Sequence, residues 1–390
     1  MIMGVFQNIV INHLDELTDR HHLSYHQTRT MKKIQVCHTQ DSGFSKEYTC
    51  DLCGKTYIHY SGCGNRNCPE CQHRNCEEWA DNYEKYLLDG IAYFHLVFTF
   101  PSELNPLFYQ NQDLLYPLMY DASKRALIDA TKEDYGKTGF TFILHTWGSD
   151  LNYHPHIHGI VAGGGITTDD EGNQIFRKAP DNFLVSVKVL SKLLRGKFID
   201  SLKRLYRKGK LTLTGKCEYL TSPDDFNSFI SDLYEKEWVV NSKPSFKNVK
   251  AVVNYIGRYT HRIAISNSRI INYDGENGKV TFRYKSYRSN GKMKEMTLDA
   301  IEFLRRFSMH ILPSHFLKVR HYGFMANAQR KTMTALCRKL LGIHTKDSGS
   351  SDDDESNVPS SPLFECLCPE CFSKLKKIGF ERHHSLVNST

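Results

Sequence analysis

The placement of the cysteines constrains this chain more than any other feature. Of twelve cysteines in 390 residues, seven lie between Cys37 and Cys76 and three between Cys366 and Cys371. The first residues lack the basic and apolar segments of a secretory signal, and no apolar run approaches the ~20 residues of a membrane span. We therefore expect a cytoplasmic protein whose clustered Cys-x-x-Cys pairs bind metal rather than form disulfides.

The first cysteine cluster contains two Cys-x-x-Cys pairs separated by fourteen residues. This C-x2-C-x14-C-x2-C spacing is typical of a structural zinc ion held by four thiolates, with no position left for substrate. The predicted ligands of this ion are Cys50, Cys53, Cys68 and Cys71. Two further cysteines, Cys37 and Cys63, could hold a second zinc ion or could be small buried hydrophobic residues.

A second group of cysteines lies near the other end of the chain. Cys366, Cys368 and Cys371 offer three thiolates, and His383 or His384 could supply a fourth ligand. This pattern favours a small zinc ribbon at the C-terminal end.

Composition and patterning divide the chain into five expected units. An acidic, Ser-rich stretch without aromatic residues predicts a disordered linker late in the chain. The units are 1–36, an N-terminal helical segment; 37–90, a zinc-binding and DNA-binding domain; 91–345, a catalytic domain; 346–362, the linker; and 363–390, the C-terminal cysteine cluster.

Basic residues are concentrated in three stretches, although the net charge is only +8. Residues 243–294 hold twelve Lys or Arg against two acids, residues 316–346 hold seven against none, and residues 186–210 hold nine against one. Any one stretch could be a solvated helix face. Together they favour a nucleic-acid partner, because such a footprint suits a phosphate backbone.

A histidine pair lies within an apolar segment in the middle of the chain. His156 and His158 are two residues apart on a predicted strand, so both rings project from one face while Ile157 points into the core. This arrangement suits a divalent cation with open coordination positions. The alternative is the polar face of an edge strand. Asp150, His154 and His261 are candidate third ligands.

Two tyrosines share one face of a predicted basic helix. Tyr255 and Tyr259 are four residues apart, with Arg258 and Arg262 close to them. The alternative is a pair of core aromatic residues. A metal ion bound by paired histidines, together with a tyrosine, supplies the groups that DNA transesterification requires. In this reaction a phenolate attacks the phosphate, and no ATP is consumed.

The chain resembles the two-tyrosine HUH transposases of rolling-circle insertion sequences (HUH is His, bulky hydrophobic, His). The residues that carry the resemblance are Cys63-Gly-Asn-Arg-Asn-Cys-Pro-Glu-Cys-Gln72, Val97-Phe-Thr-Phe-Pro101, His154-Pro-His-Ile-His158 with Gly163-Gly-Gly165, residues 255–266, and Tyr322-Gly-Phe. The resemblance implies an α+β fold, the HUH palm, with a central antiparallel sheet flanked by helices and Cys-rich zinc modules at both ends. It also implies His156 and His158 as ligands of Mg²⁺ or Mn²⁺, and Tyr255 and Tyr259 as nucleophiles.

The expected function is a transposase that nicks and rejoins single DNA strands through 5′-phosphotyrosine intermediates at element ends and targets. The alternatives are a rolling-circle replication initiator and a non-catalytic zinc-dependent DNA-binding regulator. No nucleotide cofactor is expected, because no Walker loop is present. The protein would act on bacterial DNA in the cytoplasm, and the oligomeric state stays open. The predicted DNA-binding residues are Lys250, Arg258, Arg262 and Arg269.

Overall fold

The computed structural model describes residues 4–71, 82–246, 249, 251–253, 263–286, 289, 291–343, 368–371 and 373–382. The fold is α+β, with antiparallel sheets flanked by helices, as expected. The largest sheet has six strands in the order β11-β4-β5-β3-β7, and β6 pairs with the distal half of β5. Its strands are β3 (Tyr93–Thr99), β4 (Lys137–Trp147), β5 (Tyr153–Thr168), β6 (Gln174–Lys178), β7 (Val240–Phe246) and β11 (Val319–Tyr322).

Alternation along the central strands gives the sheet two different faces. On β4, Phe140, Phe142 and Leu144 enter the largest hydrophobic cluster, and the intervening residues point to the opposite face. The expected burial of Ile157 in the core is confirmed. The neighbouring His156 and His158 therefore lie on the face away from that cluster.

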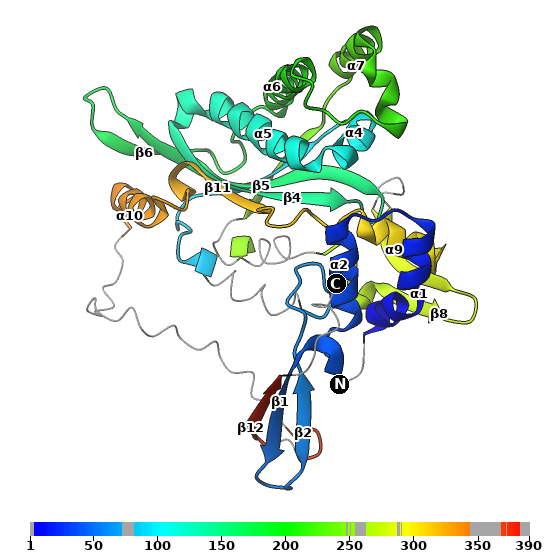
Figure 1. Cartoon of the computed structure of the whole chain (residues 1–390). Coiled ribbons are helices and arrows are strands. Elements are labelled where there is room, and N and C mark those ends of the chain that lie inside the picture. Colours follow the sequence, from blue (N-terminus) through cyan, green and yellow to red (C-terminus); the bar gives the residue numbers. More distant parts are fainter. Residues whose placement is uncertain are drawn as a thin grey trace.

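One helical layer covers the first face of the sheet, above it in Figure 1. Its members are α4 (Asn105–Gln110), α5 (Gln112–Tyr135), α6 (Val187–Arg207) and α7 (Pro223–Glu235). The start of α7 is specified locally, because the Ser222 side chain accepts a hydrogen bond from the Asp225 N–H and Pro223 occupies the first turn.

A second hydrophobic cluster lies at the end of the sheet where β4 turns into β5. It joins Trp147 and Leu151 to the N-terminal helices and to a three-stranded sheet with the order β10-β9-β8. The elements are α1 (Val5–Arg20), α2 (Tyr25–Gln35), α9 (Ala300–Ser308), β8 (Ile270–Asp274), β9 (Lys279–Ser286) and β10 (Lys292–Asp299). A further helix, α10 (Arg330–Leu340), packs in a third cluster with residues of β5.

The remaining sheet joins the two ends of the chain. Its order is β12-β1-β2, with β1 (Phe44–Cys50), β2 (Thr56–Tyr60) and β12 (Leu375–Arg382). Figure 1 shows the dark-red β12 beside the blue β1, at the lower end of the molecule. The predicted Cys-rich segments at the two ends of the sequence therefore meet in one sheet, because the C-terminal strand pairs with the N-terminal hairpin.

Parts of the predicted organisation lie outside the described residues, among them the linker at 346–362 and most of the predicted tyrosine helix. Within the described part of the chain, no helix combines the length and apolar character needed to cross a membrane.

Candidate active site and metal centres

Three histidines converge on the sheet face opposite the helical layer. His145 comes from β4 and His156 and His158 from β5, and one ring nitrogen of each lies within 4.8 Å of the others. The Nε2 atoms of His156 and His158 are 3.0 Å apart. The antiparallel register places His145 directly opposite His156, so both side chains project from the same face. Three imidazoles in this arrangement can bind one metal ion.

Hydrogen bonds to the Nδ1 atoms fix the orientation of the His156 and His158 rings. The Nδ1 atom of His156 is 2.7 Å from the carbonyl oxygen of His154, and Nδ1 of His158 is 2.9 Å from Nε2 of His95 on β3. A ligating histidine normally donates its second ring N–H to such a partner, which leaves the other nitrogen for the metal. Burial, assisted by Lys243, lowers the pKa of His95 to about 4, so this ring is neutral and can accept a hydrogen bond.

The third histidine of the cluster was missed in the sequence. Among the predicted candidates, Asp150 uses its carboxylate to accept hydrogen bonds from the backbone and side-chain nitrogens of Asn152, at 3.2 and 2.6 Å. His154 lies near His156 but outside the three-residue cluster, and His261 is outside the described residues. The described structure therefore supplies His145 instead of Asp150 or His154. His145 lies in an apolar stretch typical of a strand, residues 141–147, but its position opposite His156 depends on the register of two strands.

A cavity of about 710 Å³ opens over the histidines. Its charged lining residues are Lys243, Arg269 and Lys285, with no carboxylate among the described lining residues. A pocket with this lining attracts an anion such as a phosphodiester. Arg269, predicted to bind DNA, already donates to the backbone carbonyls of Arg283, Ala264 and Ser149. Arg269 therefore stabilises the backbone of the cavity wall and also contributes positive charge to the cavity.

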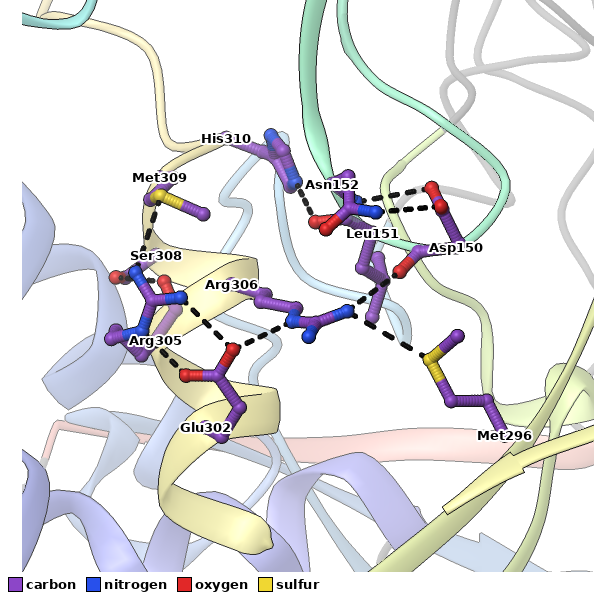
Figure 2. Close-up of polar contacts among 10 residues, drawn as sticks. All are labelled: Asp150, Leu151, Asn152, Met296, Glu302, Arg305, Arg306, Ser308, Met309 and His310. Atoms are coloured by element: carbon purple, nitrogen blue, oxygen red, sulfur yellow. Dashed lines mark hydrogen bonds and ion pairs between the residues drawn. The ribbon is translucent and has the colours of Figure 1, made fainter. Parts of the chain in front are cut away.

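The turn between β4 and β5 is held by helix α9, as Figure 2 shows. His310 Nε2 is 3.1 Å from the Leu151 carbonyl oxygen, and Arg306 donates to the Asp150 carbonyl at 3.4 Å. Glu302 fixes Arg306 through an ion pair of 2.7 Å. Hydrogen bonds from Arg305 and then Arg306 lower the pKa of Glu302 to about 2, so the carboxylate stays ionised near neutral pH.

Leu151 shows how tightly this turn is specified. Its φ of +62° lies in the left-handed region that non-glycine residues seldom adopt, and its side chain is fully buried. Burial in the second hydrophobic cluster offsets the backbone strain. The turn therefore fixes the relative position of the strands that carry the histidines.

One group of four thiols lies beside the N-terminal helices. Its members are Cys37, Cys63, Cys68 and Cys71. Cys37 Sγ is 3.5 Å from Cys71 Sγ and 3.7 Å from Cys68 Sγ, and Cys63 Sγ is 3.7 Å from Cys71 Sγ. The alternative in which Cys37 and Cys63 are only small buried residues is not favoured, because both join the cluster.

A second group of four thiols combines the two ends of the chain. Its members are Cys50, Cys53, Cys368 and Cys371. The described structure therefore divides the predicted ligands Cys50, Cys53, Cys68 and Cys71 between two groups, and it places the C-terminal Cys368 and Cys371 with Cys50 and Cys53. Strand β2 explains the division, because five extended residues at about 3.3 Å each carry the chain about 17 Å from the Cys50–Cys53 turn. Cys366, His383 and His384 lie outside the described residues.

Two family models match this chain. One, described as "Transposase zinc-binding domain" and of the IS91 type, covers residues 9–100, and one described as "Putative transposase" covers residues 139–332. A curated relative named "Putative transposase y4qJ", from Sinorhizobium fredii, is 40% identical over 324 residues, which are 82% of this chain and 80% of the relative. The transposase for insertion sequence element IS801 of Pseudomonas savastanoi pv. phaseolicola is 31% identical over 310 residues, 77% of this chain and 70% of the relative. The chain belongs to the IS91/IS801 transposase family.

No solved structure matches this transposase significantly. The zinc-binding model spans all four thiols of the Cys37 cluster, and together they support a structural zinc ion in the N-terminal part of the transposase. The same model contains Cys50 and Cys53, whereas Cys368 and Cys371 lie beyond both matched ranges. The predicted transposase identity is confirmed, and it implies DNA as the partner.

The predicted nucleophiles of the transposase lie outside the described residues, as do Lys250, Arg258 and Arg262. The chain just before Tyr255 is described, however. Residues 251–253 are helical, and Val252 and Val253 belong to the same hydrophobic cluster as Ile160 and Ala162 of β5. Ile160 follows His158 by two residues and projects from the same sheet face. Residues 251–253, shortly before Tyr255 in the sequence, therefore lie on the sheet face that carries the histidines.

Proposed function

We propose that this transposase nicks and rejoins single DNA strands at the ends of its element, with His145, His156 and His158 holding a divalent cation and Tyr255 and Tyr259 acting as nucleophiles. The observation that carries the proposal is the convergence of three imidazoles in a basic cavity. The placement of Val252 and Val253, shortly before Tyr255, on the same sheet face supports it.

The donor set is suitable for a catalytic metal. Three neutral imidazoles occupy part of a coordination shell and leave the remaining positions for phosphate oxygens and water. They also leave the full positive charge of the ion uncompensated, which favours an anionic substrate. Such a cation would polarise the scissile phosphate and stabilise the charge that develops on its oxygens.

The side chains around the metal position would perform the remaining steps. The phenolate of one tyrosine attacks the phosphorus, the bond from phosphorus to the 3′-oxygen breaks, and that oxygen takes up a proton. The products are a 5′-phosphotyrosine and a free 3′-hydroxyl, so the energy of the phosphodiester is retained for rejoining. Lys243 and Lys285, at the cavity wall, would bind neighbouring phosphates, while His95 and the His154 carbonyl hold the ligand rings in place.

The direct test is incubation of the purified transposase with single-stranded DNA from the element ends and Mn²⁺. A covalent protein–DNA band on a denaturing gel is the expected result. Changing both His156 and His158 to Ala should abolish the band and leave single-strand binding within a few-fold, because Lys and Arg contacts to phosphates dominate affinity. Unchanged cleavage by the double variant would show that His156 and His158 do not hold the metal ion. Cleavage of duplex DNA alone would show that single-stranded DNA is not the substrate.

The choice of metal gives a second prediction. Mg²⁺ is a hard ion that prefers oxygen ligands, whereas imidazole nitrogen binds transition metals more strongly. We therefore expect half-maximal cleavage at a Mn²⁺ concentration at least about tenfold below that of Mg²⁺. The measurement is a metal titration of the cleavage rate at constant ionic strength. Equal or better activity at low Mg²⁺ would indicate that oxygen ligands dominate the site.

A further inference from the structure

The second cysteine cluster is built from both ends of the chain. Cys50 ends β1 and Cys53 lies in the turn that leads to β2, whereas Cys368 and Cys371 lie just before β12. The matched zinc-binding model includes only the first of these pairs. We propose that these four cysteines bind one Zn²⁺, separate from the zinc of the Cys37 cluster, and that this ion fastens the C-terminal strand to the N-terminal sheet.

The sulfur positions fit a tetrahedral ion. Cys50 Sγ is 3.4 Å from Cys371 Sγ, and Cys53 Sγ is 3.6 Å from Cys368 Sγ. In a tetrahedron with Zn–S bonds of about 2.3 Å, neighbouring sulfurs are about 3.8 Å apart. The thiols therefore already occupy nearly the spacing that zinc requires. Four soft sulfur ligands select zinc over Mg²⁺ or Ca²⁺.

The two cysteine turns also share a backbone geometry. The Cys50 N–H donates to the Lys55 carbonyl at 2.9 Å, and the Cys368 N–H donates to the Ser373 carbonyl at 2.8 Å, the same offset of five residues. In the first turn, the Cys53 N–H also points to Cys50 Sγ at 3.4 Å, and Gly54 has a φ of +69°. Each turn thus presents its two thiols to a common point.

Contacts around the cluster join the two ends. Lys55 forms an ion pair with Glu370, the Tyr57 hydroxyl is 3.2 Å from Cys368 Sγ, and the Ser373 hydroxyl is 2.9 Å from Cys50 Sγ. Hydrogen bonds to the sulfurs are typical of the shell around thiolate-bound metals. Both ends therefore contribute to the surroundings of the site as well as to its ligands.

The sheet beside the cluster has little else to stabilise it. None of the hydrophobic clusters among the described residues contains a residue of β1, β2 or β12. The large apolar side chains of Ile58, Ile378 and Phe380 are more than half exposed. A three-stranded sheet without a core needs another source of folding free energy, and zinc ligation supplies it in small modules.

Zinc content measured on the purified full-length chain tests the assignment. We expect two zinc ions per chain. Cys50→Ser and Cys371→Ser should each lose one ion, and the variant with both changes should also lose only one, because they ligate the same ion. Cys50→Ser combined with Cys68→Ser should lose both. Cys217→Ser, a buried cysteine outside both clusters, is the matched control and should retain two.

Two outcomes would overturn the shared site. Loss of two ions by the Cys50→Ser, Cys371→Ser variant would indicate independent sites at the two ends. Retention of both ions by Cys371→Ser would exclude the C-terminal pair as ligands.

A second experiment keeps every ligand and tests the fastening itself. A protease site is inserted between residues 350 and 360, in the Ser- and Asp-rich stretch, and the chain is cut after purification. The C-terminal fragment should co-elute with the rest of the chain until a chelator removes the zinc. Release of the fragment on cleavage alone, or its retention after complete zinc removal, would show that the metal does not fasten it.

Discussion

Replacing His145 with Ala should reduce DNA cleavage at least about 10²–10³-fold, the size of effect expected when a preorganised electrostatic group at the reacting phosphate is lost. His145 is buried on β4, and its ring supplies one of three nitrogens that lie within 4.8 Å of each other. Without it, two imidazoles from a single strand remain. The measurement is the rate of covalent adduct formation at fixed Mn²⁺, together with Mn²⁺ affinity by calorimetry.

The matched comparison for this variant is His154→Ala. His154 lines the same cavity, but it contacts the His156 ring through its backbone carbonyl oxygen, which accepts the hydrogen bond and is kept in the substitution. We therefore expect a much smaller loss of metal affinity than in His145→Ala. The reverse order, with His154→Ala losing the metal and His145→Ala keeping it, would assign the third ligand to His154.

Changing both Tyr255 and Tyr259 to Phe should eliminate the covalent protein–DNA adduct completely. The substitution deletes only the hydroxyl, so packing is preserved while the nucleophile is lost. Each single variant should still form an adduct in vitro, because one nucleophile remains. Each single variant should nevertheless lose transposition, because one tyrosine must hold a strand end while the other tyrosine attacks a second strand. Adducts are measured on denaturing gels and transposition in a donor-plasmid assay.

Two outcomes would contradict the two-tyrosine prediction. An adduct formed by the double variant, mapped by peptide mass to another tyrosine such as Tyr284 or Tyr287, would move the nucleophile elsewhere. Full transposition by one single variant would leave one working nucleophile and one packing residue. Metal binding measured in parallel should be unchanged in all three variants, which separates loss of the nucleophile from loss of the site.

Local patterns were sufficient to predict the strand that carries the histidine pair. A strand was predicted around Ile157, and β5 contains it. The alternation along this strand placed His156 and His158 on one face, because side chains two residues apart on a strand project together. The alternation of side chains along one strand involves only a few neighbouring residues, so the sequence alone is sufficient to predict it.

The third histidine could not be found in this way, because it depends on how two strands are aligned. His145 meets His156 only in the observed register of β4 and β5, which includes an irregularity just after His145. A shift of one residue would turn His145 to the opposite face of the sheet. That register is set by the turn at Leu151 and its contacts with Arg306 of α9 and with His310 just after it, contacts that no local sequence pattern indicates.

The division of the cysteines was missed for a related reason. Spacing along the chain paired Cys50 and Cys53 with Cys68 and Cys71, whereas the fold pairs them with residues more than 300 positions away. A ligand set chosen by local spacing assumes a compact loop between the two pairs. Here the intervening residues include the extended strand β2. The other two ligand positions beside Cys50 and Cys53 are therefore occupied by Cys368 and Cys371.

The joined ends have a consequence for how the protein is made. Cys53 and Cys368 are 315 positions apart, so a ribosome adding about 5–20 residues per second needs roughly 15–60 s between synthesising them. During that interval the first hairpin has only half of its ligands and lacks its neighbouring strand. A chain released early, by a nonsense codon or a broken message, would never complete this sheet. The fold thus allows the N-terminal sheet to form completely only after residue 382 has been synthesised.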